Sequence, residues 1–143
     1  MTQNSDFLSA LRLGQQKLLQ GSTTHNEIVG VLDRFGAALH DYTEGRLGVG
    51  CVTAEGHEPV DGYFQVGSPM SIVVVLHEDK NRPIPIVGGF SVPVAGFPVQ
   101  VSFGERVYTA NDEAELENAF MALAASRELA AAVNELLGVN AKH

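Results

Sequence analysis

Residues 83–103 have the sequence PIPIVGGFSVPVAGFPVQVSF, which contains no Asp, Glu, Lys, Arg or His. Prolines at 83, 85, 93 and 98 and glycines at 88, 89 and 96 interrupt it. This density of proline excludes a membrane-spanning helix, which would lose too many backbone hydrogen bonds in lipid. The stretch therefore forms either the core of the domain or an apolar surface that another molecule covers. Because each proline removes a ladder donor, we expect part of it to be an edge strand or an irregular loop.

The residues on both sides of this stretch carry the pattern of short strands. Residues 71–76 (SIVVVL) are rich in β-branched side chains, which is typical of an interior strand. Residues 103–106 place Gly104 first in a two-residue turn, which predicts a hairpin between residues 99–103 and 106–109. Residues 46–110 thus contain five or six strands with connections too short for crossover helices. An antiparallel meander is expected.

Helical patterns flank the predicted sheet. Residues 5–42 contain two of them, the first ending near Gly21. In the second, Thr24 and Glu27 have the spacing of a capping box. One face of this helix is expected to be buried by Ile28, Val31, Leu32, Phe35, Leu39 and Tyr42. Residues 111–137 predict two more helices, with Ser126 capping the last and Gly138 ending it.

These patterns predict an α+β fold. We expect an N-terminal helix pair, an antiparallel β-meander of five to six strands, and a C-terminal helix pair packed on the sheet. The 143 residues, 45% hydrophobic and 18% charged, suit a single globular domain over residues 1–143.

Charge and cysteine content restrict the partners and the compartment. Nine basic and 17 acidic residues give a net charge of −8, which disfavours nucleic acid and anionic membrane surfaces and mildly favours a basic protein partner. Cys51 is the one cysteine, so no intrachain disulfide forms. The first ten residues lack the pattern of a signal peptide. We expect a cytoplasmic protein.

No catalytic, metal or cofactor signature stands out in the sequence, and we expect none of these sites. The histidines lack metal-ligand spacing. Cys51 lies in phase with Leu47 and Val49 in a strand pattern, which predicts a buried, inert thiol. Gly48 and Gly50 share one strand face, and we expect a helix to pack closely against it.

The densest charge feature is an acidic cluster at the start of the third predicted helix. Carboxylates there are stabilised by the helix dipole, which explains the cluster without a function. The alternative is a docking patch for a basic partner. The candidate partner-binding residues are Asp112, Glu113, Glu115 and Glu117, together with Phe90 and Phe97 of the uncharged stretch.

The leading hypothesis is a non-enzymatic acidic protein that binds and occludes a partner protein, as immunity proteins, antitoxins, inhibitors and secretion chaperones do. One alternative is a small-molecule-binding or catalytic domain with a pocket between sheet and helices. Its expected lining residues are Tyr63, Phe64, His77 and Phe90. Another is a homodimer or larger homo-oligomer whose uncharged stretch is the subunit interface.

Overall fold

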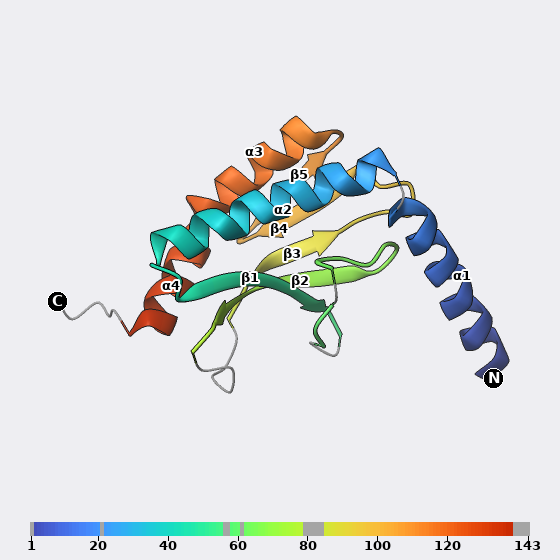
Figure 1. Cartoon of the computed structure of the whole chain (residues 1–143), viewed down its shortest axis with the longest axis horizontal. Helices are drawn as coiled ribbons and strands as arrows, with labels where there is room; N and C mark the ends of the chain where they lie inside the picture. Colours follow the sequence, from blue (N-terminus) through green and yellow to red (C-terminus); the bar gives the residue numbers. More distant parts are fainter. Residues whose placement is uncertain (1, 21, 56–57, 61, 79–84, 139–143) are drawn as a thin grey trace.

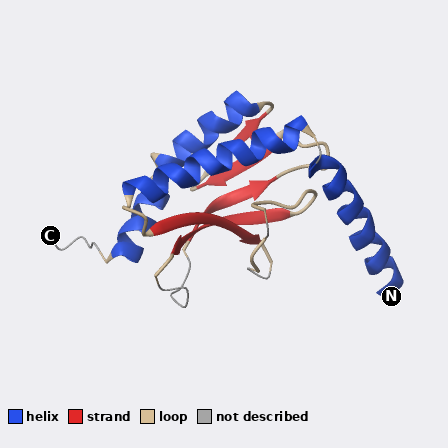
Figure 2. Ribbon diagram, viewed as in Figure 1, coloured by secondary structure: helices blue, strands red, loops and turns tan. Residues whose placement is uncertain are grey.

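The computed structural model describes residues 2–20, 22–55, 58–60, 62–78 and 85–138, and only the backbone of residues 2–6, 19 and 20. Within these ranges the chain forms four α-helices and one five-stranded sheet (Figure 1, Figure 2). The elements are α1 (Thr2–Gln20), α2 (Thr23–Tyr42), β1 (Leu47–Thr53), β2 (Pro69–Leu76), β3 (Ile86–Ser91), β4 (Val99–Phe103), β5 (Arg106–Ala110), α3 (Glu113–Ala124) and α4 (Arg127–Leu137). The predicted α+β class is confirmed.

The sheet is an antiparallel meander. Its strand order is β1-β2-β3-β4-β5, so every strand pairs with its neighbours in the sequence. Phe103 pairs with Arg106 across a two-residue turn. Gly104 in that turn has φ +59°, a conformation that glycine adopts without strain. The predicted hairpin is therefore confirmed.

The uncharged stretch contributes the central strand of the sheet. Pro85, Pro93 and Pro98 all lie outside β3, so they remove none of its ladder donors. The side chains of Val87 and Phe90 are 3% and 2% exposed. We expected part of the stretch to be an edge strand or an irregular loop, and the second alternative is correct for residues 92–98. Pro83 lies outside the described residues. The residues of this stretch that belong to the core are Val87, Phe90, Val92, Val99, Val101 and Phe103.

Helices α2, α3 and α4 share one hydrophobic cluster with one face of the sheet (Figure 1). Helix α2 contacts β1, α3 contacts β4 and β5, and α4 contacts β2 and β3. A series of aromatic contacts crosses the layers, with ring centroids 5.1 Å apart for Phe35–Phe120, 5.8 Å for Phe120–Phe90 and 6.3 Å for Phe90–Phe64. The predicted apolar face of α2 is buried except for Tyr42, which is 81% exposed at the helix end.

The helix ends confirm some sequence signals and correct one. Ser126 caps α4 by accepting a hydrogen bond from the Leu129 N–H at 3.1 Å, and α4 ends before Gly138 at φ +75°. Helix α2 instead begins after Ser22, whose hydroxyl accepts from the His25 N–H at 3.1 Å. The capping box predicted at Thr24 was therefore placed two residues late, because Ser22 is an equally good cap.

The other face of the sheet carries small side chains, and no helix among the described residues packs on it. The strand register places Gly48 and Gly50 on this face, opposite Val75 and Val73. A helix against these glycines was a wrong expectation. The close neighbour of Gly48 is the His77 ring, because a Cβ at Gly48 would lie 2.7 Å from its Nε2 atom.

Candidate functional site

Two residues of the acidic cluster stabilise the start of α3. The Asp112 carboxylate caps the helix by accepting a hydrogen bond from the Glu115 N–H at 2.9 Å. The Glu115 carboxylate accepts from the backbone N–H of Asn111 at 2.7 Å. This is the capping role that the sequence already offered as the explanation without a function.

The other two acidic residues join α3 to α2. Arg34 of α2 lies 3.4 Å from a carboxylate oxygen of Glu113 and 3.1 Å from one of Glu117. The three side chains are 40–52% exposed, so solvent screens the ion pairs and each contributes less than about 1 kcal/mol. They remain accessible to a partner, and the two carboxylates leave this group with a net negative charge.

The two aromatic candidates of the uncharged stretch belong to the domain's own packing. Phe90 is 2% exposed and contacts Phe120 of α3, so a partner cannot reach its ring. Phe97 is partly buried and packs against the core. We therefore exclude Phe90 from the surface considered below.

The four residues of the alternative pocket do not converge. Phe64 and Phe90 contact each other inside the core. The Tyr63 hydroxyl donates a hydrogen bond of 2.6 Å to Asp33 of α2. His77 lies beside His40, with ring centroids 6.1 Å apart. These side chains point to three different places and do not form one binding site.

The thiol of Cys51 is buried and unreactive. Cys51 is 3% exposed, as predicted, and burial raises the pKa of its thiol to about 12, so the nucleophilic thiolate does not form near neutral pH. Within the described ranges, no group of three or more His, Cys, Asp and Glu side chains is placed to hold a metal ion.

An apolar groove lies between α2 and the two C-terminal helices, α3 and α4, and sequence reasoning did not identify it. Its main cavity, of about 510 Å³, lies between α2 and α4, and a second of about 160 Å³ lies between α2 and α3. Both are lined by Phe35, Ala38 and Ala124, so they form one continuous groove, which we call the α2 groove. The remaining residues of the main cavity are Leu39, Tyr42, Leu129, Ala130, Val133 and Asn134.

Small side chains create this groove. Ala38, Ala124 and Ala130 come from α2, α3 and α4, and all three are solvent-exposed. Where alanines face each other, the helices leave space that larger side chains would fill. Tyr42 borders the main cavity with 81% of its surface exposed, and Met121 borders the smaller one with 63% exposed.

The main cavity of the groove is uncharged, but the helices around it are acidic. None of the residues that line the main cavity carries a charge. Helices α2, α3 and α4 together contain eight acidic and two basic side chains, so they carry −6 of the chain's net charge of −8. An apolar floor within an acidic surround favours a partner with complementary basic groups.

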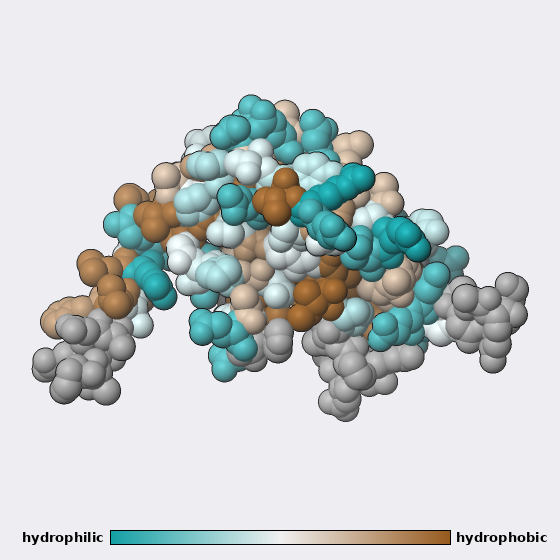
Figure 3. All heavy atoms as spheres, turned by 180° about the vertical axis from the view of Figure 1, so that it is seen from behind, coloured by the Kyte–Doolittle hydropathy of each residue, from teal (hydrophilic) through white to brown (hydrophobic). Residues whose placement is uncertain are grey.

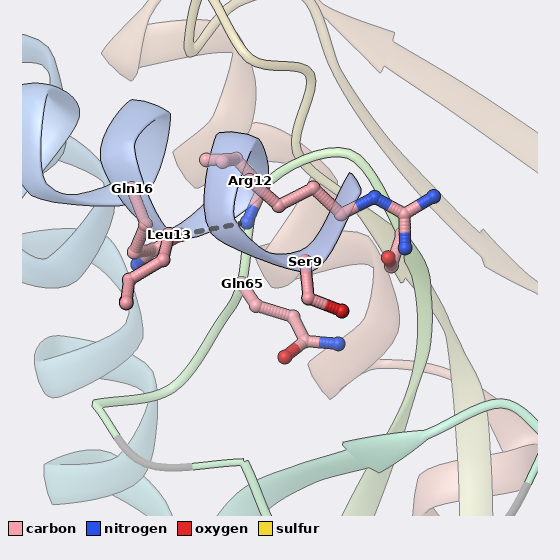
Figure 4. Close-up of a pocket in the computed structure, with 7 residues that line it drawn as sticks. Ser9, Arg12, Leu13, Gln16 and Gln65 are labelled. Atoms are coloured by element: carbon pink, nitrogen blue, oxygen red, sulfur yellow. Dashed lines mark hydrogen bonds between the residues drawn. The ribbon is translucent and has the colours of Figure 1, made fainter. Parts of the chain in front are cut away.

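Helix α1 extends away from the sheet (Figure 1). Gln16 (Figure 4) anchors it to the loop before β2. The Gln16 amide accepts a hydrogen bond from the Val66 N–H at 2.8 Å and donates one to the Phe64 carbonyl oxygen at 3.3 Å. A cavity of about 330 Å³ separates helix and loop, lined by Ser9, Arg12, Leu13, Gln16, Gln65, Val66 and Ser68. Apolar side chains are exposed along the α1 arm (Figure 3).

Comparisons with known proteins do not place the chain in a family. No protein-family model, curated protein or solved structure matches it. Among the described helices, none has the length and apolar character required to cross a membrane.

Proposed function

We propose that the protein is a non-enzymatic, cytoplasmic binding protein that occludes a segment of a partner protein in the α2 groove. The observation that carries this proposal is the groove itself, an uncharged cavity of about 510 Å³ open to solvent between acidic helices. An amphipathic helix with an apolar face and basic residues beside it has the matching chemistry. The buried single cysteine suits a reducing compartment.

The lining residues suit recognition by apolar contact. Tyrosine is enriched among the residues that dominate binding energy, and Tyr42 presents most of its ring at the groove. Met121 has a flexible thioether side chain that adapts to differently shaped partners. Desolvation of these two side chains and of the alanine floor supplies the affinity.

The acidic surround supplies encounter rate and selectivity. Negative charge on the three helices attracts a basic segment and repels an acidic one, and salt screens both effects. Glu113 and Glu117 already bind Arg34, and a partner's cation at this position competes with that arginine. Immunity proteins, antitoxins, inhibitors and secretion chaperones all act by occluding a partner, so the proposal covers this class as a whole.

A designed peptide tests the proposal. The peptide is a helix of about 20 residues with a leucine stripe and lysines elsewhere, and its counterpart carries glutamates in place of the lysines. Fluorescence anisotropy of labelled peptide measures the dissociation constant in low and high salt. We expect the lysine peptide to bind below about 100 μM, more weakly in high salt, and the glutamate peptide to bind at least about tenfold more weakly.

Two pairs of variants locate the binding site. Ala38→Trp and Ala130→Trp fill the groove, whereas Ala37→Trp and Ala131→Trp alter the neighbouring exposed alanines, which do not line it. We expect only the first variant of each pair to weaken lysine-peptide binding, by at least about tenfold. Equal effects within a pair, or equal binding of both peptides, would contradict the proposal.

A further inference from the structure

Helix α1 has two opposite faces with different roles. Ser9, Arg12, Leu13 and Gln16 line the cavity toward the protein's own loop. At about 100° per residue, positions 7, 11, 14 and 18 form the opposite face, about 180° away around the helix. The side chains of Phe7, Leu11 and Leu18 on that face are 69%, 65% and 73% exposed. The anchored face is therefore mostly polar, with Leu13 as its one leucine, and the apolar face points away from the domain.

The apolar face has the spacing of a coiled-coil seam. Phe7, Leu11, Gly14 and Leu18 are separated by four, three and four residues, the alternation of a and d positions. Gly14 is a gap in this seam, since a Cβ built on it would have no heavy atom within 4 Å. A partner helix with a large side chain at the right level would fill that space.

We propose that this seam, the α1 seam (Phe7, Leu11, Gly14 and Leu18), pairs antiparallel with the α1 seam of a second copy of the chain. The seam is self-complementary about its midpoint. Antiparallel pairing places Leu11 against Gly14 of the second copy, and Phe7 against Leu18 of the second copy. Parallel pairing would place glycine against glycine and leave a void.

The charges of α1 oppose this pairing less than the charges of the other helices would. With Arg12, Lys17 and Asp6, α1 is net positive, whereas α2, α3 and α4 are each net negative. Two copies of a chain of charge −8 therefore approach with least repulsion through α1. In the antiparallel arrangement Lys17 lies beside Ala10 of the second copy, and Arg12 lies on the cavity side of α1, so no two cations oppose each other.

The test is the oligomeric state of the full chain. We expect sedimentation velocity to show a monomer–dimer equilibrium with a dissociation constant in the micromolar range, because the seam is shorter than two heptads. Leu11→Lys removes two leucines from a twofold interface, and we expect it to raise this constant by more than about 100-fold. Leu13→Lys is the control, because Leu13 is a similarly exposed leucine on the opposite side of the helix.

A disulfide test distinguishes the orientation. In the variant Ala10→Cys/Lys17→Cys, the antiparallel pair brings position 10 of one chain beside position 17 of the other. The two positions are too far apart to bridge within one helix. Cys51 is buried and does not compete. We expect oxidation to give a covalent dimer with 10–17 crosslinks.

Several results would overturn the pairing. A chain that stays monomeric at about 200 μM has no such dimer. A dimer that resists Leu11→Lys, or that gives 10–10 crosslinks, has another interface or orientation. Loss of the dimer in Ala38→Trp as well as in Leu11→Lys would place α1 in the α2 groove of the second copy instead. The pairing does not depend on the proposed function, because these seam variants leave the groove unaltered and the groove's peptide-binding test leaves α1 unaltered.

Discussion

Gly88 offers a quantitative test of the sheet. A Cβ at this position would lie 2.5 Å from the backbone carbonyl oxygen of Ser102 on β4. An ordinary C···O contact is about 3.3 Å, so Gly88→Ala forces β3 and β4 apart locally by roughly 0.8 Å. Overpacking of this kind costs about 1–3 kcal/mol, offset by about 0.4–1 kcal/mol from the stiffer unfolded chain. We expect Gly88→Ala to lower the free energy of unfolding by about 1–2 kcal/mol.

Gly50→Ala is the matched control for this substitution. Gly50 is also a strand glycine without positive φ, but its added methyl would meet only Val73 Cγ2 at 3.9 Å, an ordinary contact. We expect its free energy of unfolding to stay the same or to rise by less than about 1 kcal/mol. Urea unfolding followed by circular dichroism measures both variants. If the two agree within about 0.5 kcal/mol, the close approach of β3 and β4 is refuted.

Three further predictions follow from the described contacts. Burial raises the pKa of the Cys51 thiol from 9.0 to about 12. The stability that the protonated thiol contributes is therefore complete below pH 9 and is lost as the pH rises toward 12. Urea unfolding across this range should show the free energy of unfolding falling more steeply with pH for the wild type than for Cys51→Ala. Arg34→Ala breaks two exposed ion pairs, and the same assay should show that the free energy of unfolding falls by less than about 1 kcal/mol. The triple variant Glu113→Lys/Glu115→Lys/Glu117→Lys should weaken binding of the lysine peptide and flatten its salt dependence; unchanged binding would remove the acidic cluster from the account.

The elements themselves were predictable because their signals are local. The apolar spacing of α2, the glycine of the 104–105 turn and the cap at Ser126 each depend on residues within a few positions of one another. The placement of β3 was not predictable in the same way. Its six residues fall between Pro85 and Pro93, and the sequence pattern does not show whether a proline lies inside a short strand or just beyond it.

The candidate surfaces depend on distances between elements, which the sequence pattern does not contain. The sequence indicated that α1 is a helix. It did not indicate that Gln16 holds this helix by its polar side and leaves Leu11 facing solvent. The α2 groove requires Ala38 and Ala130, from the two ends of the chain, to face each other. Exposed alanines in α2 and α4 are the only sequence signal for it, and alanine is common in any helix.

The most direct test of the central claim uses the absence of tryptophan from the chain. Tyr42→Trp places a single indole at the edge of the α2 groove, and Val107→Trp places one on β5, on the face of the sheet opposite the helices. Both native side chains are well exposed, so both variants start with solvent-exposed emission. We expect the lysine peptide to shift the emission of Tyr42→Trp to shorter wavelength in a saturable titration and to leave Val107→Trp unchanged. A shift at position 107 with none at position 42 would contradict the account.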